Sequence, residues 1–155
     1  MPDGKDGMFE ECHLKAADGL RLYYRDYPNA SARPPVLCLP GLTRNSRDFE
    51  PLATWISKTR RVICPDLRGR GKSQYDPEWR NYHPGQYAAD LWQLLDTLRL
   101  DEVVVIGTSL GGWMAMLLNH QKPGRIAGAV MNDIGPEADP NGIARVVATA
   151  GLLDI

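Results

Sequence analysis

The feature that most constrains the fold is a short turn, Gly107–Gly111, with the sequence Gly-Thr-Ser-Leu-Gly. It follows four apolar residues, Val103–Ile106, and leads into an apolar segment with the character of a helix. A tight strand-to-helix turn needs small residues on both sides of its central serine, because the chain folds back on itself there. A glycine-rich turn can also hold an idle serine, but the flanking strand and helix favour a strained Ser109 whose hydroxyl is exposed for attack on a carbonyl carbon.

The rest of the chain begins with strands and continues with alternating strands and helices. Two strand-like segments, 9–16 and 20–27, are separated by an Asp-Gly turn signal and predict an antiparallel hairpin. Further strands are expected at 36–39, 61–64, 103–106 and 126–131, and helices at 46–57, 87–98 and 110–120. This alternation predicts an α/β fold with a mostly parallel sheet, right-handed crossovers and helices on both faces.

Composition excludes several classes of protein. The chain has 155 residues, of which 43% are hydrophobic, enough for one buried core. A net charge of −1 offers no basic surface for nucleic acid or anionic lipid, and no apolar run approaches the roughly 18 residues of a membrane span. With no apolar signal core at the N-terminus, we expect a soluble cytoplasmic protein with a small-molecule partner, and the oligomeric state stays open.

Metals and cofactors are not indicated either. The three cysteines, Cys12, Cys38 and Cys64, show no Cys-x-x-Cys spacing, and the sequence contains no dinucleotide-binding fingerprint. We therefore expect no disulfide framework, no metal and no cofactor.

A second motif, Leu39–Leu42, ends the first expected parallel strand. Ligands bind at the carboxyl ends of such strands, so this loop should lie near the serine turn. An acyl-transfer serine needs two N–H donors aimed at the carbonyl oxygen, and the backbones of Leu42 and Leu110 are the candidates for this oxyanion hole. The alternative is an ordinary strand-ending turn, which Pro-Gly also signals.

A third segment, Asp66–Ser73, ends in Gly-Lys-Ser like a phosphate-binding loop. That motif requires a glycine where Asp66 stands, so ATP binding is excluded. We expect Asp66 and Arg68 to hold one another or nearby backbone groups and to support one wall of the site.

Four motifs follow one another along the chain, namely Leu39–Leu42, Asp66–Ser73, Gly107–Gly112 and Asn132–Pro136. Their order carries a resemblance to a known family. With them the chain resembles the N-terminal part of the α/β-hydrolase-fold superfamily, in its serine esterase or lipase-like branch. The resemblance implies that Ser109 is the nucleophile and that Leu42 and Leu110 form the oxyanion hole. A serine at this turn argues against the branches with aspartate there, the dehalogenases and epoxide hydrolases.

The resemblance also implies a division of the chain. Residues 1–135 would form the N-terminal part of the core domain, and 136–155 the start of a cap or lid, with a lid helix over 143–153. In that family an acid and a histidine follow the serine on later strands. We therefore expect the chain to be truncated before the last strands, with the histidine and the usual acid beyond Ile155.

The histidines present are poor substitutes for that base. His13 falls in the hairpin, His83 in a polar loop, and His120 about 16 Å along the helix from Ser109 at 1.5 Å per residue. Asp133 follows a parallel strand and is a candidate acid, with a turn-forming residue ahead of Gly135 as the alternative.

These observations predict a serine hydrolase that acts on an ester or related acyl compound through an acyl-enzyme. The 155-residue segment alone should be nearly inactive without its base. The alternative is a noncatalytic binding or interaction module that keeps the fold.

Overall fold

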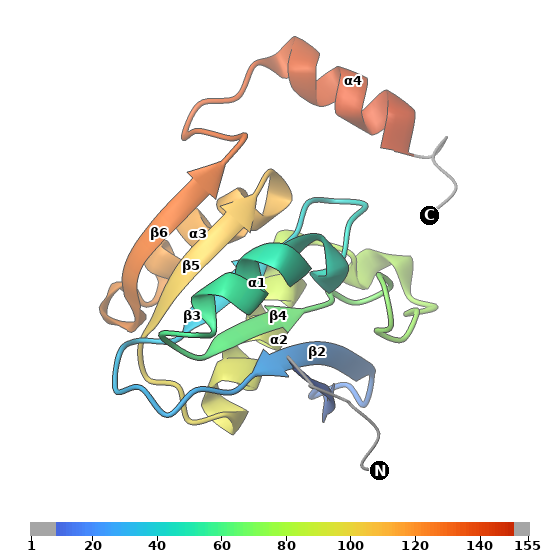
Figure 1. Cartoon of the computed structure of the whole chain (residues 1–155). Coiled ribbons are helices and arrows are strands. Elements are labelled where there is room, and N and C mark those ends of the chain that lie inside the picture. Colours follow the sequence, from blue (N-terminus) through green and yellow to red (C-terminus); the bar gives the residue numbers. More distant parts are fainter. Residues whose placement is uncertain (1–8, 151–155) are drawn as a thin grey trace.

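A six-stranded sheet forms the centre of the protein in the computed structural model, which describes residues 9–150 (Figure 1). Its strands are β1 (Glu10–Lys15), β2 (Arg21–Tyr27), β3 (Val36–Leu39), β4 (Val62–Pro65), β5 (Val103–Thr108) and β6 (Ile126–Asn132). The order across the sheet is β1-β2-β4-β3-β5-β6. β2 runs antiparallel to both β1 and β4, and the other neighbouring pairs are parallel. The predicted mostly parallel sheet with an N-terminal hairpin is confirmed.

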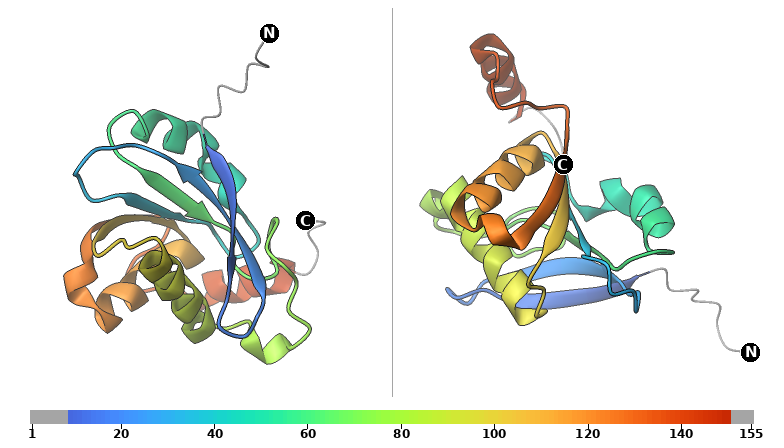
Figure 2. Two further views of the ribbon diagram at one scale, coloured as in Figure 1. Left: turned by 90° about the horizontal axis from the view of Figure 1, so that it is seen from below. Right: turned by 90° about the vertical axis from the view of Figure 1, so that its left-hand side faces the viewer.

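Helices cover both faces of this sheet. The covering helices are α1 (Glu50–Ile56), α2 (Pro84–Thr97) and α3 (Leu110–Gln121), and a further helix, α4 (Pro140–Ala150), follows β6. Figure 2 shows α1 on one face, α2 and α3 on the other, and α4 standing apart beyond the end of β6. This arrangement buries β3 and β4 at every position, as expected for strands covered on both sides.

The larger part of the core lies between the sheet and the pair α2 and α3. Leu37 and Leu39 of β3 and Val105 of β5 pack there against buried leucines of the helices. The side chains of these three strand residues are fully buried. Full burial of one such side chain contributes roughly 1.5–3 kcal/mol. Because these strands end at the same edge, the core holds the loops after β3, β4 and β5 in fixed relation to one another.

Two helices begin differently from the sequence prediction. α2 starts three residues before Tyr87, because His83 caps it by accepting a hydrogen bond from the Gln86 N–H (3.3 Å) and Pro84 takes the first helical position. The helix expected from Ser46 begins with a turn of 3₁₀ helix, Ser46–Phe49, before α1.

The segment expected to begin a lid contains a helix, α4, which starts three residues earlier than predicted, and residues 151–153 of the prediction lie outside the described chain. Among residues 9–150, no helix combines the length and apolar character that crossing a membrane requires.

Candidate active site

Ser109 occupies the turn between β5 and α3 with φ 51° and ψ −113°. A positive φ is uncommon for residues other than glycine and costs free energy, of order 1–3 kcal/mol. Backbone hydrogen bonds hold it in place, because the Ser109 N–H donates to the Asn132 carbonyl (3.0 Å) and the Ser109 carbonyl accepts from the Gly112 (2.9 Å) and Trp113 (3.1 Å) N–H groups. The turn therefore has the strained backbone that the sequence predicts.

Two glycines make this turn possible. A Cβ added at Gly111 would lie 1.9 Å from the Leu39 carbonyl oxygen, and one added at Gly107 would lie 2.2 Å from the Gly111 carbonyl oxygen. Both contacts are with backbone atoms, which cannot move aside as a flexible side chain can. The turn is thus packed directly against the end of β3.

A pocket of about 200 Å³ opens beside Ser109. Its lining comes from the loop after β3, the end of β5 and the exposed helix α4, namely Gly41, Leu42, Thr43, Arg44, Thr108, Ser109, Val146 and Thr149. A Cβ built on Gly41 would lie 3.8 Å from the Ser109 Cβ, so the two loops are in close contact. The structure brings Leu42 and Ser109 together, as predicted.

The backbone donors on either side of the serine have different surroundings. Leu110 is the first residue of α3, where N–H groups lack an intrahelical partner and the helix dipole is positive. Leu42 lies in a turn closed by the Arg44 N–H, which donates to the Gly41 carbonyl (3.1 Å). The start of α3 at Leu110 therefore favours a negatively charged group beside Ser109.

Arg44 brings one positive charge to the pocket wall. Its Nε and Nη2 donate to Asp48 at 2.7 and 2.8 Å, and these bonds raise the pKa of Arg44. The side chain stays charged and is largely exposed, with its charge balanced by its neighbour.

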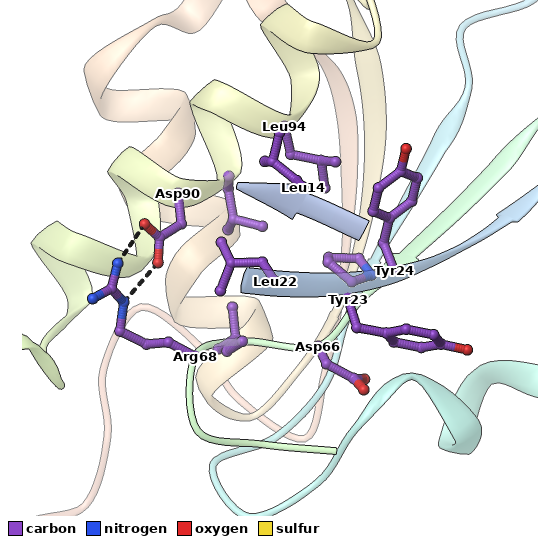
Figure 3. A pocket seen from close by; sticks show the side chains of 11 residues that line it. Leu14, Leu22, Tyr23, Tyr24, Asp66, Arg68, Asp90 and Leu94 are labelled. Atoms are coloured by element: carbon purple, nitrogen blue, oxygen red, sulfur yellow. Dashed lines mark hydrogen bonds and ion pairs between the residues drawn. The ribbon is translucent and has the colours of Figure 1, made fainter. Parts of the chain in front are cut away.

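Arg68 is fully buried and pairs with three carboxylates, two of which come from distant segments. It donates to Asp90 through Nε and Nη2 (both 2.8 Å), and its Nη1 donates to Asp18 (2.9 Å) and Asp76 (2.6 Å). Figure 3 shows the paired bonds to Asp90. Burial alone would lower the pKa of Arg68, but the hydrogen bonds to Asp90 and Asp18 raise it.

The suggestion that Arg68 and Asp66 hold one another is therefore wrong, whereas the alternative, bonding to backbone groups, holds for Asp66. Its carboxylate accepts from the Ser46 N–H (2.7 Å) and the Lys72 N–H (2.8 Å). A Cβ on Gly71 would lie 2.1 Å from an Asp66 oxygen, which explains the glycine there. Asp66 thus ties the loop after β3 to the loop after β4.

A second cavity lies between the hairpin and α2, beside Arg68 and Asp90 (Figure 3). Its volume of about 10 Å³ has room for one water molecule at most, and apolar side chains such as Leu14, Leu22 and Leu94 line much of it. It is a packing defect rather than a ligand site.

The structure places the histidines away from the serine pocket. His13 packs edge-on against Tyr23, with ring centroids 5.5 Å apart, His83 caps α2, and His120 is exposed in the last turn of α3. Within residues 9–150, none of them lines the pocket of Ser109.

Asp133 directly follows β6, whose last residue, Asn132, pairs with Thr108 beside the serine. It is exposed, has φ 59°, and does not line the pocket. No grouping of three or more potential metal ligands occurs in the part of the chain that the structure describes.

Sequence reasoning did not single out Val146 and Thr149, which reach the pocket from α4. The only signal for them was the apolar spacing of that helix, which indicates an amphipathic helix but not what its face contacts. It also missed Arg70, whose Nε donates to the Leu42 carbonyl (3.0 Å).

Two relatives of known sequence match most of this chain. The 3-hydroxybutyrate-oligomer hydrolase of Cupriavidus necator is 33% identical over 144 residues, which cover 93% of this chain and 49% of that protein. The sn-1-specific diacylglycerol lipase ABHD11 of Xenopus tropicalis is 34% identical over 119 residues, 76% of this chain and 36% of that protein. The chain thus spans half or less of the length of these relatives.

Solved structures share the fold. A crystal structure of an alpha/beta hydrolase from Novosphingobium aromaticivorans superposes with a TM-score of 0.90 at 50% identity, covering 93% of this chain and 50% of that chain. The epoxide hydrolase VrEH1 from Vigna radiata gives a TM-score of 0.73 at 21% identity, covering 90% and 46%, and this likeness shows the fold alone. The family model for the alpha/beta hydrolase fold matches residues 34–151, and the chain belongs to this family.

Proposed function

We propose that the protein is a serine hydrolase that cleaves an ester or related acyl bond through an acyl-enzyme on Ser109. The observation that carries this proposal is the strained serine turn, which faces the Gly41–Leu42 loop across one pocket. The names of two relatives support the substrate class, since a hydroxybutyrate oligomer and a diacylglycerol are both joined by ester bonds.

In the proposed reaction the Ser109 hydroxyl oxygen attacks the carbonyl carbon and forms a new C–O bond, while the carbonyl oxygen becomes an oxyanion. The backbone N–H groups of Leu42 and Leu110 donate to that oxyanion. The alcohol then leaves with a proton, and water attacks the acyl-enzyme to release the acid and restore the serine.

The base that accepts the serine proton is assigned in this proposal to a histidine beyond Ile155, because the three histidines of this sequence lie away from the pocket. Asp133 is retained as a candidate for the acid that orients this base, since it follows the strand next to the serine turn. We assign α4 to the start of a cap that shapes the acyl site through Val146 and Thr149.

The serine tests the proposal. Exposure of the complete protein to a fluorophosphonate probe should label it, and Ser109→Ala should abolish the labelling and lower hydrolysis of nitrophenyl butyrate by roughly 10³–10⁶-fold. Ser57→Ala is the control, because that hydroxyl bonds to the Thr54 carbonyl at the end of α1. Labelling that survives Ser109→Ala would refute the assignment.

The position of the histidines supports a second candidate, a binding or interaction module without catalysis. In that case the complete protein would neither react with the probe nor hydrolyse the ester, and Ser109→Ala would leave its behaviour unchanged.

A further inference from the structure

Arg70 connects the loop after β4 to the loop that carries Leu42. Its Nε donates to the Leu42 carbonyl (3.0 Å) and its Nη1 donates to the Arg68 carbonyl (3.0 Å). The guanidinium also lies over two aromatic rings, 4.9 Å from the centroid of Tyr87 and 5.8 Å from that of Tyr82. Such stacking and paired donation leave a planar guanidinium little freedom.

The contact matters because of how peptide units are built. The Gly41 carbonyl and the Leu42 N–H belong to one planar trans unit and point in opposite directions. The Gly41 carbonyl is held by the Arg44 N–H (3.1 Å), so this bond sets the direction of the Leu42 N–H. The next unit carries the Leu42 carbonyl, and Arg70 holds it. Hydrogen bonds thus restrain the peptide units on both sides of Leu42.

Arg70 itself has rigid supports. Tyr87 is buried in α2, and the Tyr82 hydroxyl accepts from the Asp76 N–H (2.7 Å). The Arg68 backbone that receives the second bond belongs to a residue whose side chain is fixed by three carboxylates. A buried and well-bonded part of the molecule is therefore connected to the Leu42 loop through Arg70.

We propose that Arg70 is a positioning residue for the Leu42 N–H, holding this donor where the oxyanion of the reaction forms. The inference rests on the proposed hydrolytic function. A donor stabilises the transition state only when it is aimed at the place the oxyanion will occupy. Release of the Leu42 loop from Arg70 should therefore reduce the stabilisation of the transition state much more than the affinity for the substrate.

The test compares Arg70→Met with Arg80→Met in the complete protein. Arg80 is a matched control, because its guanidinium also lies over an aromatic ring, Trp79, at 4.7 Å, and it pairs with Glu78, but it is exposed. With nitrophenyl butyrate, Arg70→Met should lower kcat roughly 10- to 100-fold, less than the 10²–10³-fold cost of losing an oxyanion donor outright, while KM changes about twofold or less. Arg80→Met should leave both constants unchanged.

A transition-state analogue supplies the measurement that a purely structural role would not move. The affinity for a trifluoromethyl ketone, which forms a tetrahedral adduct with serine, should fall with Arg70→Met by the same factor as kcat. Arg70→Lys keeps a positive donor without the planar fork and should give an intermediate loss, so the inference stays testable if the methionine variant folds poorly.

The inference is overturned if Arg70→Met has the kcat of the control, or if kcat falls while the affinity for the ketone does not. Failure of the proposed function looks different, because either the parent protein would not be labelled or Ser109→Ala would remain labelled. Loss of labelling in Ser109→Ala together with normal kcat in Arg70→Met would reject only the role of Arg70.

Discussion

Two polar regions at the strand ends of this sheet have opposite character. Around Arg68, a fully buried guanidinium makes four hydrogen bonds to three carboxylates. Around Ser109, a residue in a strained backbone conformation borders an open pocket. The difference indicates that the first region supplies rigidity, whereas the second combines a strained residue with an open pocket.

The two regions are physically joined. Asp66 accepts hydrogen bonds from backbone N–H groups in the loops after β3 and β4. Arg70, in the loop after β4, donates to the Leu42 carbonyl in the loop after β3. Strain of the kind seen at Ser109 persists only where the surrounding structure over-determines it. The region around Arg68 therefore stabilises the backbone geometry around Ser109. Substitutions can perturb each of the two regions separately.

The largest expected effect comes from the packing of the serine turn. Gly111→Ala would place a Cβ 1.9 Å from the Leu39 carbonyl oxygen, and we expect it to lower the free energy of unfolding by more than about 4–5 kcal/mol, a loss that few single substitutions reach. Urea unfolding of the complete protein measures it. Gly124→Ala is the control, since its Cβ meets nothing within 4 Å and should change stability by about 0.5 kcal/mol or less. Equal stability of the two variants would contradict the packing described for the turn.

The next effect concerns the buried charge. Arg68→Met leaves Asp18, Asp76 and Asp90 without their shared cation, and we expect a loss of about 3–5 kcal/mol in the free energy of unfolding. Arg44→Met, which breaks an exposed pair with Asp48, should cost far less in the same experiment, because solvent screens that pair. If Arg68→Met lowers the free energy of unfolding only slightly, the region around Arg68 does not supply the rigidity.

The smallest expected effect is a dependence on pH. The hydrogen bond from Arg68 lowers the pKa of Asp18, and a hydrogen bond from Asn81, with further help from Arg68, lowers the pKa of Asp76. Because both values are lower in the folded state, their stabilisation is complete above the ordinary aspartate pKa of about 3.9 and is lost as the pH falls through the lower folded values.

Asp18→Asn should therefore reduce the loss of stability between neutral and strongly acidic pH. Since the Asp18 side chain is 39% exposed, we expect a change of about 1 kcal/mol or less. Unfolding in urea across this pH range measures it, and a pH profile identical to that of the parent protein would argue against the pairing with Arg68.

The parts of the molecule that could be predicted from sequence are those set by neighbouring residues. The buried run Val36–Leu39 is a strand at the predicted bounds, and the serine turn follows from glycines two positions before and after Ser109. Periodicity and turn chemistry act over a few residues, so a single sequence contains them in full.

The remaining features depend on pairs that are far apart in the chain. Arg68 is 50 residues from Asp18 and 22 from Asp90, and Arg70 is 28 residues from Leu42. No local pattern identifies such partners, because the fold must first bring the loops together. For the same reason the sequence suggested a pairing of Arg68 with Asp66, two residues away. In the structure Arg68 pairs with other carboxylates, and Asp66 bonds to backbone N–H groups.

The contribution of α4 to the pocket has a consequence for how such a protein can diversify. Val146 and Thr149 belong to a separate helix that follows the sheet, whereas Ser109 and Leu42 are held by the core. Substitutions on that helix face can change the shape of the pocket while leaving Ser109 and Leu42 in place. A lineage could thus acquire new preferences through one surface segment, with little cost to the folding of the rest.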